Sequence, residues 1–204
     1  MEPFVSLTAR ACVLAWANID TDQIFPARFM KQPRAIGYDK YLFHGHRFDA
    51  GGRPVPGFPL DDPSNRGTRI LVAGRNFGCG SSREAAVYAL VDYGMRCVVA
   101  PSFGDIFASN AVNNGLLPAR VAEADVEQLM ALLDGLGGEV TVDLRECTIL
   151  AAGERFSFAI DPVWRQKLLN GWDDVDLTRG YADAIAQWLQ QDQRVRPWAG
   201  PPAV

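Results

Sequence analysis

Short apolar runs alternate with segments of helical spacing in the middle of the chain. Residues 69–73 form one apolar run. After the glycine-rich run that follows it, apolar side chains recur at helical spacing over residues 85–93. A second run, 95–100, ends at Pro101, and helical spacing returns over residues 103–111. The order strand, helix, strand, helix predicts a right-handed parallel crossover.

The N-terminal third of the chain predicts one strand followed by irregular structure. An apolar run at residues 11–16 indicates a strand, and the turn-forming residues of 18–26 end it. Residues 32–67 contain Pro and Gly at short intervals, with aromatic residues between them. We expect that segment to be irregular but packed.

The C-terminal third predicts a small β-layer between helices. A helix is expected over 124–133, a second that begins at Asp161-Pro162 and ends at Asn170-Gly171, and a last amphipathic helix around 184–189. Strands are expected at 140–144, 148–150 and 156–160. We therefore predict one α/β domain over residues 1–190, with a small β-layer and flanking helices. Residues 191–204 lack periodicity and are expected to form a tail that is mobile or bound to a partner.

Charge and hydropathy exclude two classes of partner. The chain has 20 Lys and Arg against 24 Asp and Glu, a net charge of -4, so no basic field is available to bind nucleic acid. No apolar window approaches the ~18 residues of a membrane span, and the first residues do not read as a signal peptide. We expect a soluble, cytoplasmic protein.

The residue types that hold metals are few and scattered. The four cysteines are far apart and form no C-x-x-C pair: Cys12, Cys79, Cys97 and Cys147. His44 and His46 flank a glycine and are interpreted as surface residues rather than ligands. No metal site and no cofactor bound by this chain are therefore predicted.

The glycine-rich run at 74–83 is the main candidate for chemistry. Gly78 and Gly80 directly precede a predicted helix, so backbone N–H groups and the positive end of the helix dipole converge there and favour an anion. The spacing matches neither a P-loop nor a dinucleotide fingerprint. Ser81, Ser82 and Arg83 then suit a carboxylate substrate, which an arginine can bind bidentately. The alternative is a plain tight turn in which Ser81 or Ser82 caps the helix.

Four segments of the chain resemble one known family in order and rough spacing. They resemble the swivelling domain of the aconitase superfamily and, within it, the small subunits of isopropylmalate dehydratases. The segments are NIDTDQIFPARFMK (18–31), GRNFGCGSSREAA (74–86), PSFGDIFASNAVNNGLLP (101–118) and LLNGWDDVDLTRGYADAI (168–185). The resemblance covers nearly the whole chain and implies an aconitase-like swivelling β/β/α fold.

The resemblance also implies that the active site is built from two chains. A large subunit is expected to hold a four-iron cluster through three cysteines, and one iron takes the substrate hydroxyl as a Lewis acid. In this chain the family's catalytic serine falls on Ser81, its carboxylate-binding arginine on Arg83, and its Thr-Asp turn on Asp22, which faces the same site. We expect the neighbouring Gly80 and Ser82 to bind substrate.

The segment after the Thr-Asp turn is the candidate specificity loop. Phe29 and Met30 are placed to pack an isopropyl or methyl group, whereas Arg28 or Lys31 would pair with a third carboxylate. The alternative is that Phe29 and Met30 only anchor the loop to the core.

Three functions are compatible with these features. The first, which the resemblance implies, is the small subunit of a hydro-lyase that isomerises 2-isopropylmalate to 3-isopropylmalate for leucine biosynthesis. The second is the same chemistry on homoaconitate, 2-methylmalate (citramalate) or 2,3-dimethylmalate. The third is a non-catalytic anion-binding module, against which the joint presence of Ser81, Arg83 and Asp22 argues.

Overall fold

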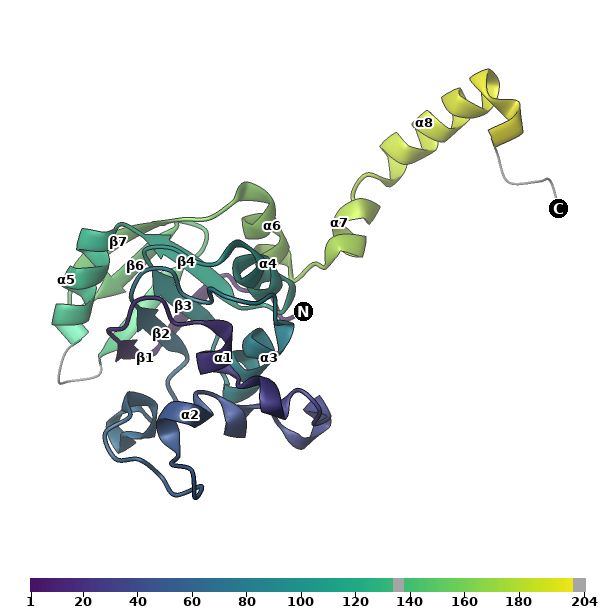
Figure 1. The fold of residues 1–204 in the computed structure, drawn as a ribbon. Helices are drawn as coiled ribbons and strands as arrows, with labels where there is room; N and C mark the ends of the chain where they lie inside the picture. The colour runs from purple at the N-terminus through teal and green to yellow at the C-terminus, as the bar shows by residue number, and fades with distance from the viewer. Residues whose placement is uncertain (134–137, 200–204) are drawn as a thin grey trace.

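The computed structural model describes residues 1–133 and 138–199, and its centre is a closed barrel (Figure 1). Around the barrel the strand order is β1-β2-β3-β4-β7-β6-β5. The strands are β1 (Ser6–Leu14), β2 (Ile70–Ala73), β3 (Cys97–Ala100), β4 (Leu117–Val121), β5 (Glu139–Asp143), β6 (Thr148–Ala151) and β7 (Glu154–Ala159).

One half of the barrel is parallel and the other antiparallel. Strands β1 to β4 pair in parallel, and helices α3 (Glu84–Tyr93) and α4 (Asp105–Asn113) connect β2 to β3 and β3 to β4. The predicted parallel crossover is thus confirmed. Strands β5, β6 and β7 pair antiparallel and form the predicted small β-layer. The sequence did not predict β4, nor that the two halves close into a barrel.

Strand β1 joins the two halves and differs from its prediction. It begins at Ser6 rather than at residue 11 and ends at Leu14 rather than at 16. Its first half pairs antiparallel with β5, and its second half, from Ala11, pairs in parallel with β2. The first half was missed because its residues SLTAR are only partly apolar, since the barrel covers one of their two faces.

The described residues form six further helices, of which the last two extend away from the barrel (Figure 1). They are α1 (Thr21–Ile24), α2 (His44–Arg47), α5 (Glu123–Leu133), α6 (Pro162–Asn170), α7 (Asp174–Arg179) and α8 (Ala182–Val195). The prediction for α6 is confirmed: the Asp161 side chain accepts hydrogen bonds from the N–H groups of Val163 and Trp164, and Gly171 ends the helix with φ 71°. The expected irregular excursion is also found, as short 3-10 turns between α1 and β2.

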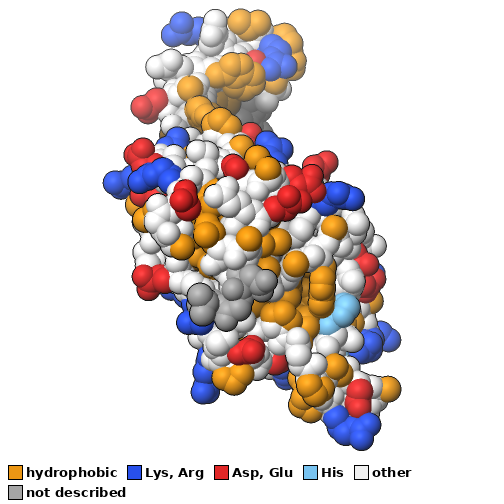
Figure 2. Space-filling model, turned by 90° about the vertical axis from the view of Figure 1, so that its left-hand side faces the viewer, with side chains coloured by type: hydrophobic (Ala, Val, Ile, Leu, Met, Phe, Trp, Pro, Cys, Tyr) orange, Lys and Arg blue, Asp and Glu red, His pale blue; other side chains and the backbone are white. Residues whose placement is uncertain are grey.

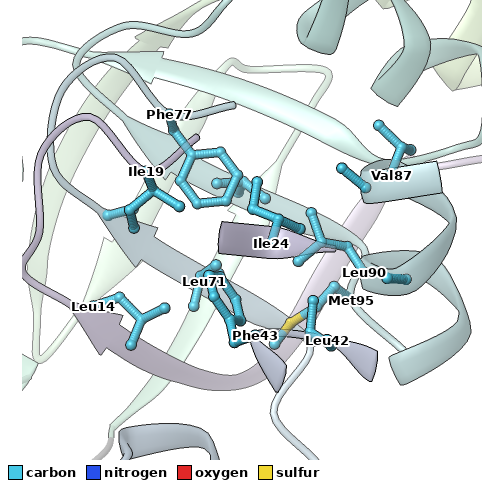
Figure 3. Close-up of a cluster of buried hydrophobic side chains, with 14 of the residues drawn as sticks. Leu14, Ile19, Ile24, Leu42, Phe43, Leu71, Phe77, Val87, Leu90 and Met95 are labelled. Carbon is cyan, nitrogen blue, oxygen red and sulfur yellow. The ribbon is translucent and has the colours of Figure 1, made fainter. Parts of the chain in front are cut away.

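The barrel strands separate two hydrophobic clusters. Side chains from all seven strands form the inner cluster, to which Ile70 and Val72 of β2 contribute. The alternate residues Leu71 and Ala73 point outward into a second cluster with α1, α3 and the excursion (Figure 3). In that view Phe77 and Ile24 lie together at the end of β2, so the outer cluster fixes the loop that follows this strand.

The last two helices of the described chain are not packed on the barrel. Helices α7 and α8 extend away from the body of the molecule (Figure 1). Contrary to the expectation of an aperiodic tail from residue 191, α8 continues to Val195 and a 3-10 turn, Pro197–Ala199, follows. Residues 200–204 of the expected tail lie outside the described residues.

Candidate active site

The loop between β2 and α3 is held by backbone hydrogen bonds on both sides. On one side the Gly78 N–H donates to the Ile19 carbonyl at 2.7 Å and the Thr21 N–H donates to the Cys79 carbonyl at 2.9 Å. On the other side the Gly104 N–H donates to the Phe77 carbonyl at 2.9 Å. Two segments that are distant in sequence, one around residues 19–21 and one at Gly104, therefore bind this loop and fix its path.

Glycine is required at position 78 by packing as well as by conformation. Gly78 has φ 71°, and a Cβ there would lie 2.2 Å from Cγ of Phe107. Gly104 has the same close approach from the other side, since its Cβ would lie 2.5 Å from the Gly78 carbonyl oxygen. The loop and the first turn of α4 are thus in direct contact, and no side chain fits between them.

Neither serine of the loop caps helix α3. The N-cap position belongs to Arg83, which makes no side-chain capping hydrogen bond, and the helix begins at Glu84. The alternative interpretation of Ser81 or Ser82 as the N-cap is therefore wrong. Both serines are exposed, so a ligand can reach their hydroxyl groups.

Arg83 and Asp22 form an ion pair although they are 61 positions apart. The Arg83 side chain is 18% exposed and Asp22 is 54% exposed, so the pair lies at the mouth of the site rather than in the core. The hydrogen bond from Arg83 lowers the pKa of Asp22 below its usual value, with a further contribution from the Ala27 N–H. Asp22 is consequently a carboxylate at neutral pH and orients the guanidinium.

A cavity of about 270 Å³ brings together Ser81, Arg83 and Thr21. The loop glycines Gly78 and Gly80 line it as well. Its remaining wall comes from Gly104 to Phe107, at the start of α4. The cavity thus combines an exposed hydroxyl and one oriented cation with a wall that carries the apolar side chains of Ile106 and Phe107 and the carboxyl group of Asp105. The hydroxyl, the cation and the apolar side chains suit a small carboxylate with an alkyl group.

Asp22 lines a second cavity, of about 380 Å³, on the side of the candidate specificity loop. Arg28 lies there and donates from Nη2 toward Nδ1 of His44 at 3.2 Å. Phe29 stacks on Tyr41 with ring centroids 4.1 Å apart, which is the anchoring arrangement, and Met30 is 49% exposed. The structure thus brings Asp22, Ser81 and Arg83 together, while Phe29 and Met30 line neither cavity.

The described residues contain no cluster of three or more His, Cys, Asp or Glu side chains that could hold a metal ion. Burial and the nearby Asp20 raise the pKa of Cys79, so its thiol remains protonated at neutral pH. A protonated thiol is a poor metal ligand and a poor nucleophile. None of the helices described is long and apolar enough to cross a membrane.

Comparisons with known proteins agree with this geometry. Residues 1–124 match the aconitase C-terminal domain family. A 3-isopropylmalate dehydratase small subunit of Shouchella clausii is 46% identical over 96% of this chain and 99% of its own length. The 3-isopropylmalate dehydratase small subunit of Bacillus subtilis is 44% identical over 94% of this chain and 96% of its own length. The chain belongs to the 3-isopropylmalate dehydratase small-subunit family. The predicted hydro-lyase class, the small-subunit role and the place in leucine biosynthesis are thereby confirmed.

A solved structure of a related dehydratase has a fold similar to that of this chain. The crystal structure of 3-isopropylmalate dehydratase from Methanocaldococcus jannaschii has 25% sequence identity and a TM-score of 0.65. The superposition covers 89% of this chain and 98% of that chain. The predicted aconitase-like fold is therefore confirmed as well.

Two contributors to the site were not predicted from the sequence. Thr21 is 2% exposed, and its hydroxyl donates to the Ser81 carbonyl at 2.9 Å. The segment from Gly104 to Phe107 forms a cavity wall, a role that its sequence did not predict. For Thr21 the one local signal was its position directly before the acidic turn residue Asp22. For the second, the parallel crossover implied that the loops after β2 and β3 meet at one edge.

Proposed function

We propose that this chain, paired with a cluster-bearing large subunit, interconverts 2-isopropylmalate and 3-isopropylmalate through a dehydrated intermediate. The observation that carries the proposal is the Arg83–Asp22 ion pair at the mouth of a cavity that also holds the Ser81 hydroxyl. In the relatives' names the subunit is small, which supports a second chain. The free cysteines support a cytoplasmic setting, where thiols stay reduced.

The reaction removes a proton and a hydroxyl group from adjacent carbons and returns them in exchanged positions. The large subunit's iron-sulfur cluster would supply a Lewis acid for the departing hydroxyl. Ser81 would act as the base: its oxygen takes the proton from the carbon next to a carboxylate, and the electron pair of that C–H bond forms the double bond. On rehydration Ser81 returns the proton to the neighbouring carbon.

Arg83 has two tasks in this proposal. Its guanidinium binds a substrate carboxylate through donors that Asp22 does not occupy, and its positive charge favours the serine alkoxide. Asp22 holds the guanidinium in place, so little side-chain entropy is lost when the substrate binds. Thr21 acts as a positioning residue, because it fixes the backbone of Ser81.

The test is anaerobic reconstitution with the large subunit of the same organism. We expect neither chain alone to convert 3-isopropylmalate and the mixture to convert it, followed by the ultraviolet absorbance of the unsaturated intermediate. Turnover by this chain alone would refute the two-chain proposal. Faster turnover of homoaconitate than of isopropylmalate would refute the proposed substrate.

A further inference from the structure

The C-terminal arm, which we define as residues 174–199, contains no buried residue in α7, α8 or the final 3-10 turn. It projects from the barrel as a separate limb (Figure 1). Apolar side chains are visible over this limb at the top of the molecule in Figure 2. An isolated helix of 14 residues, the length of α8, is only marginally stable in water, so it needs cover from elsewhere.

Helix α8 has one apolar face and one polar face. Tyr181, Ile185 and Leu189 recur at intervals of four and are 61%, 42% and 46% exposed, and Trp188 beside them is 56% exposed. The opposite face carries Asp183, Gln187, Gln190 and Arg194. Between α7 and α8 lies an apolar groove of about 660 Å³ that Ile185 and Leu189 line. This is the pattern of a helix that binds a groove of another protein.

The exposed apolar area suits a protein interface. Tyr181, Trp188 and Trp198 are 61%, 56% and 78% exposed. At ~200 Å² for each aromatic side chain, these three alone present roughly 400 Å², about half of what one partner contributes to a standard interface. The aliphatic side chains of the same face add to this area.

An ion pair between a buried lysine and an exposed aspartate connects the start of the arm to the body. Lys167 of α6 is 3% exposed, and its ammonium donates to Asp174 Oδ1 of α7 at 2.6 Å and to Asn113 Oδ1 of α4 at 2.5 Å. A buried ammonium is costly unless it is paired, so α7 begins at a fixed place on the body. The opposite end of α4 lines the site cavity. This helix of nine residues spans only about 13 Å, so a chain that closes the cavity lies close to the arm.

We propose that the arm is a docking element for the large subunit, which covers the apolar face of α8. This inference rests on the proposed two-chain function. The small subunit of Shouchella clausii matches 195 residues of this chain, so most of the arm belongs to the shared length. A second copy of this chain would cover the arm but would not complete the site, whereas the large subunit does both.

The experiment compares two neighbouring residues on opposite faces of α8 in the full chain. Leu189→Glu puts a carboxylate on the apolar face, and Gln190→Glu puts the same charge on the polar face. The dissociation constant for the large subunit is measured by titration calorimetry. We expect Leu189→Glu to weaken it at least tenfold and Gln190→Glu to change it less than twofold. Trp188→Ser, which adds no charge, should also weaken it at least tenfold.

Thermal unfolding and light scattering of each free variant complete the test. Unchanged melting of the barrel with weakened binding supports the proposal, because the altered side chains are exposed in the free chain. Binding by Leu189→Glu and Trp188→Ser as tight as wild type would overturn it. A wild-type dimer that Leu189→Glu converts to monomer, with unchanged affinity for the large subunit, would assign the arm to self-association instead. Absence of any wild-type binding would refute the two-chain function itself, a result distinct from these.

Discussion

The hydroxyl of Thr21 donates to the backbone carbonyl of Ser81 at 2.9 Å and thereby ties α1 to the candidate catalytic loop. Thr21→Val preserves the shape of the side chain but leaves that carbonyl without its partner. We expect about 1 kcal/mol lower stability and, because Ser81 is less firmly placed, a roughly tenfold lower kcat in the reconstituted enzyme. Thermal unfolding and steady-state kinetics measure the two effects.

The matched control is Thr8→Val. Thr8 shares a hydrogen bond of 2.8 Å with Thr141 on the exposed surface of the barrel, where β1 pairs with β5, and neither residue lines the site cavity. The Thr8→Val substitution should leave kcat unchanged. A Thr21→Val enzyme with full kcat would show that this hydrogen bond does not position Ser81.

Ser81 and Ser82 are both exposed, but only Ser81 lines the cavity with Arg83. Ser81→Ala removes the proposed base without altering the backbone, so kcat should fall roughly a thousandfold or more while binding of the large subunit persists. Ser82→Ala should have a smaller effect. Equal, mild effects of the two substitutions on steady-state rates would exclude Ser81 as the base.

Arg83→Lys keeps the positive charge but loses the planar fork that Asp22 orients. We expect KM to rise and kcat to fall together, a loss of roughly 2 to 4 kcal/mol in transition-state binding. Arg75→Lys serves as control, because Arg75 is 63% exposed in the same loop and pairs with Glu123 away from the cavity. Unchanged kinetics of Arg83→Lys would remove this residue from the site.

How far the sequence predicted the structure depends on the range of the interactions involved. Helix α6 was predicted at both ends because its signals, the Asp161 cap and Gly171, are local. The closed barrel was not, because it depends on pairings such as Ser6 with Asp143, which no local pattern encodes. Helix α8 was predicted too short, because its last turns are polar and expose all their residues except Asp192, so periodicity fades there.

In the candidate site, too, local features were predicted from the sequence and long-range contacts were not. The glycine-rich loop was recognised from its own residues, but the pairing of Asp22 with Arg83 joins two distant segments and could be anticipated only from the family resemblance. The contact of Thr21 with Ser81 lies at the same junction and was missed. Phe29 was expected either to bind an alkyl group or to anchor its loop, and its stacking on Tyr41 is a tertiary contact that favours anchoring.

The buried thiols predict a pattern of reactivity and of pH dependence. Burial raises the pKa of Cys12 from 9.0 to about 12, and burial raises the pKa of Cys97 as well. Both groups favour the folded state fully below pH 9.0, where they are protonated in either state, and this contribution declines as the pH rises toward 12. At pH 8 we expect iodoacetamide to label the partly exposed Cys147 and, more slowly because of its raised pKa, Cys79, but not the buried Cys12 or Cys97, by mass spectrometry. Labelling of all four thiols in the native protein would contradict this burial.

The last prediction concerns substrate choice by the loop that follows Asp22. Phe29 is engaged with Tyr41, whereas Met30 is 49% exposed and remains available to contact substrate once the large subunit covers the site. Each buried methylene is worth about 0.8 kcal/mol, so loss of an apolar contact to the isopropyl group is measurable. Met30→Arg should therefore lower kcat/KM for isopropylmalate at least tenfold and spare or improve that for homoaconitate, because a guanidinium opposes an alkyl group but pairs with a third carboxylate. Met30 lies two residues after Arg28, which lines the second cavity, whereas Ile36 lies eight residues after it and is 42% exposed on the same excursion, so Ile36→Arg is the control. The measurement is the ratio of kcat/KM for the two substrates in wild-type and variant complexes, and an unchanged ratio for Met30→Arg would falsify a specificity role for this loop.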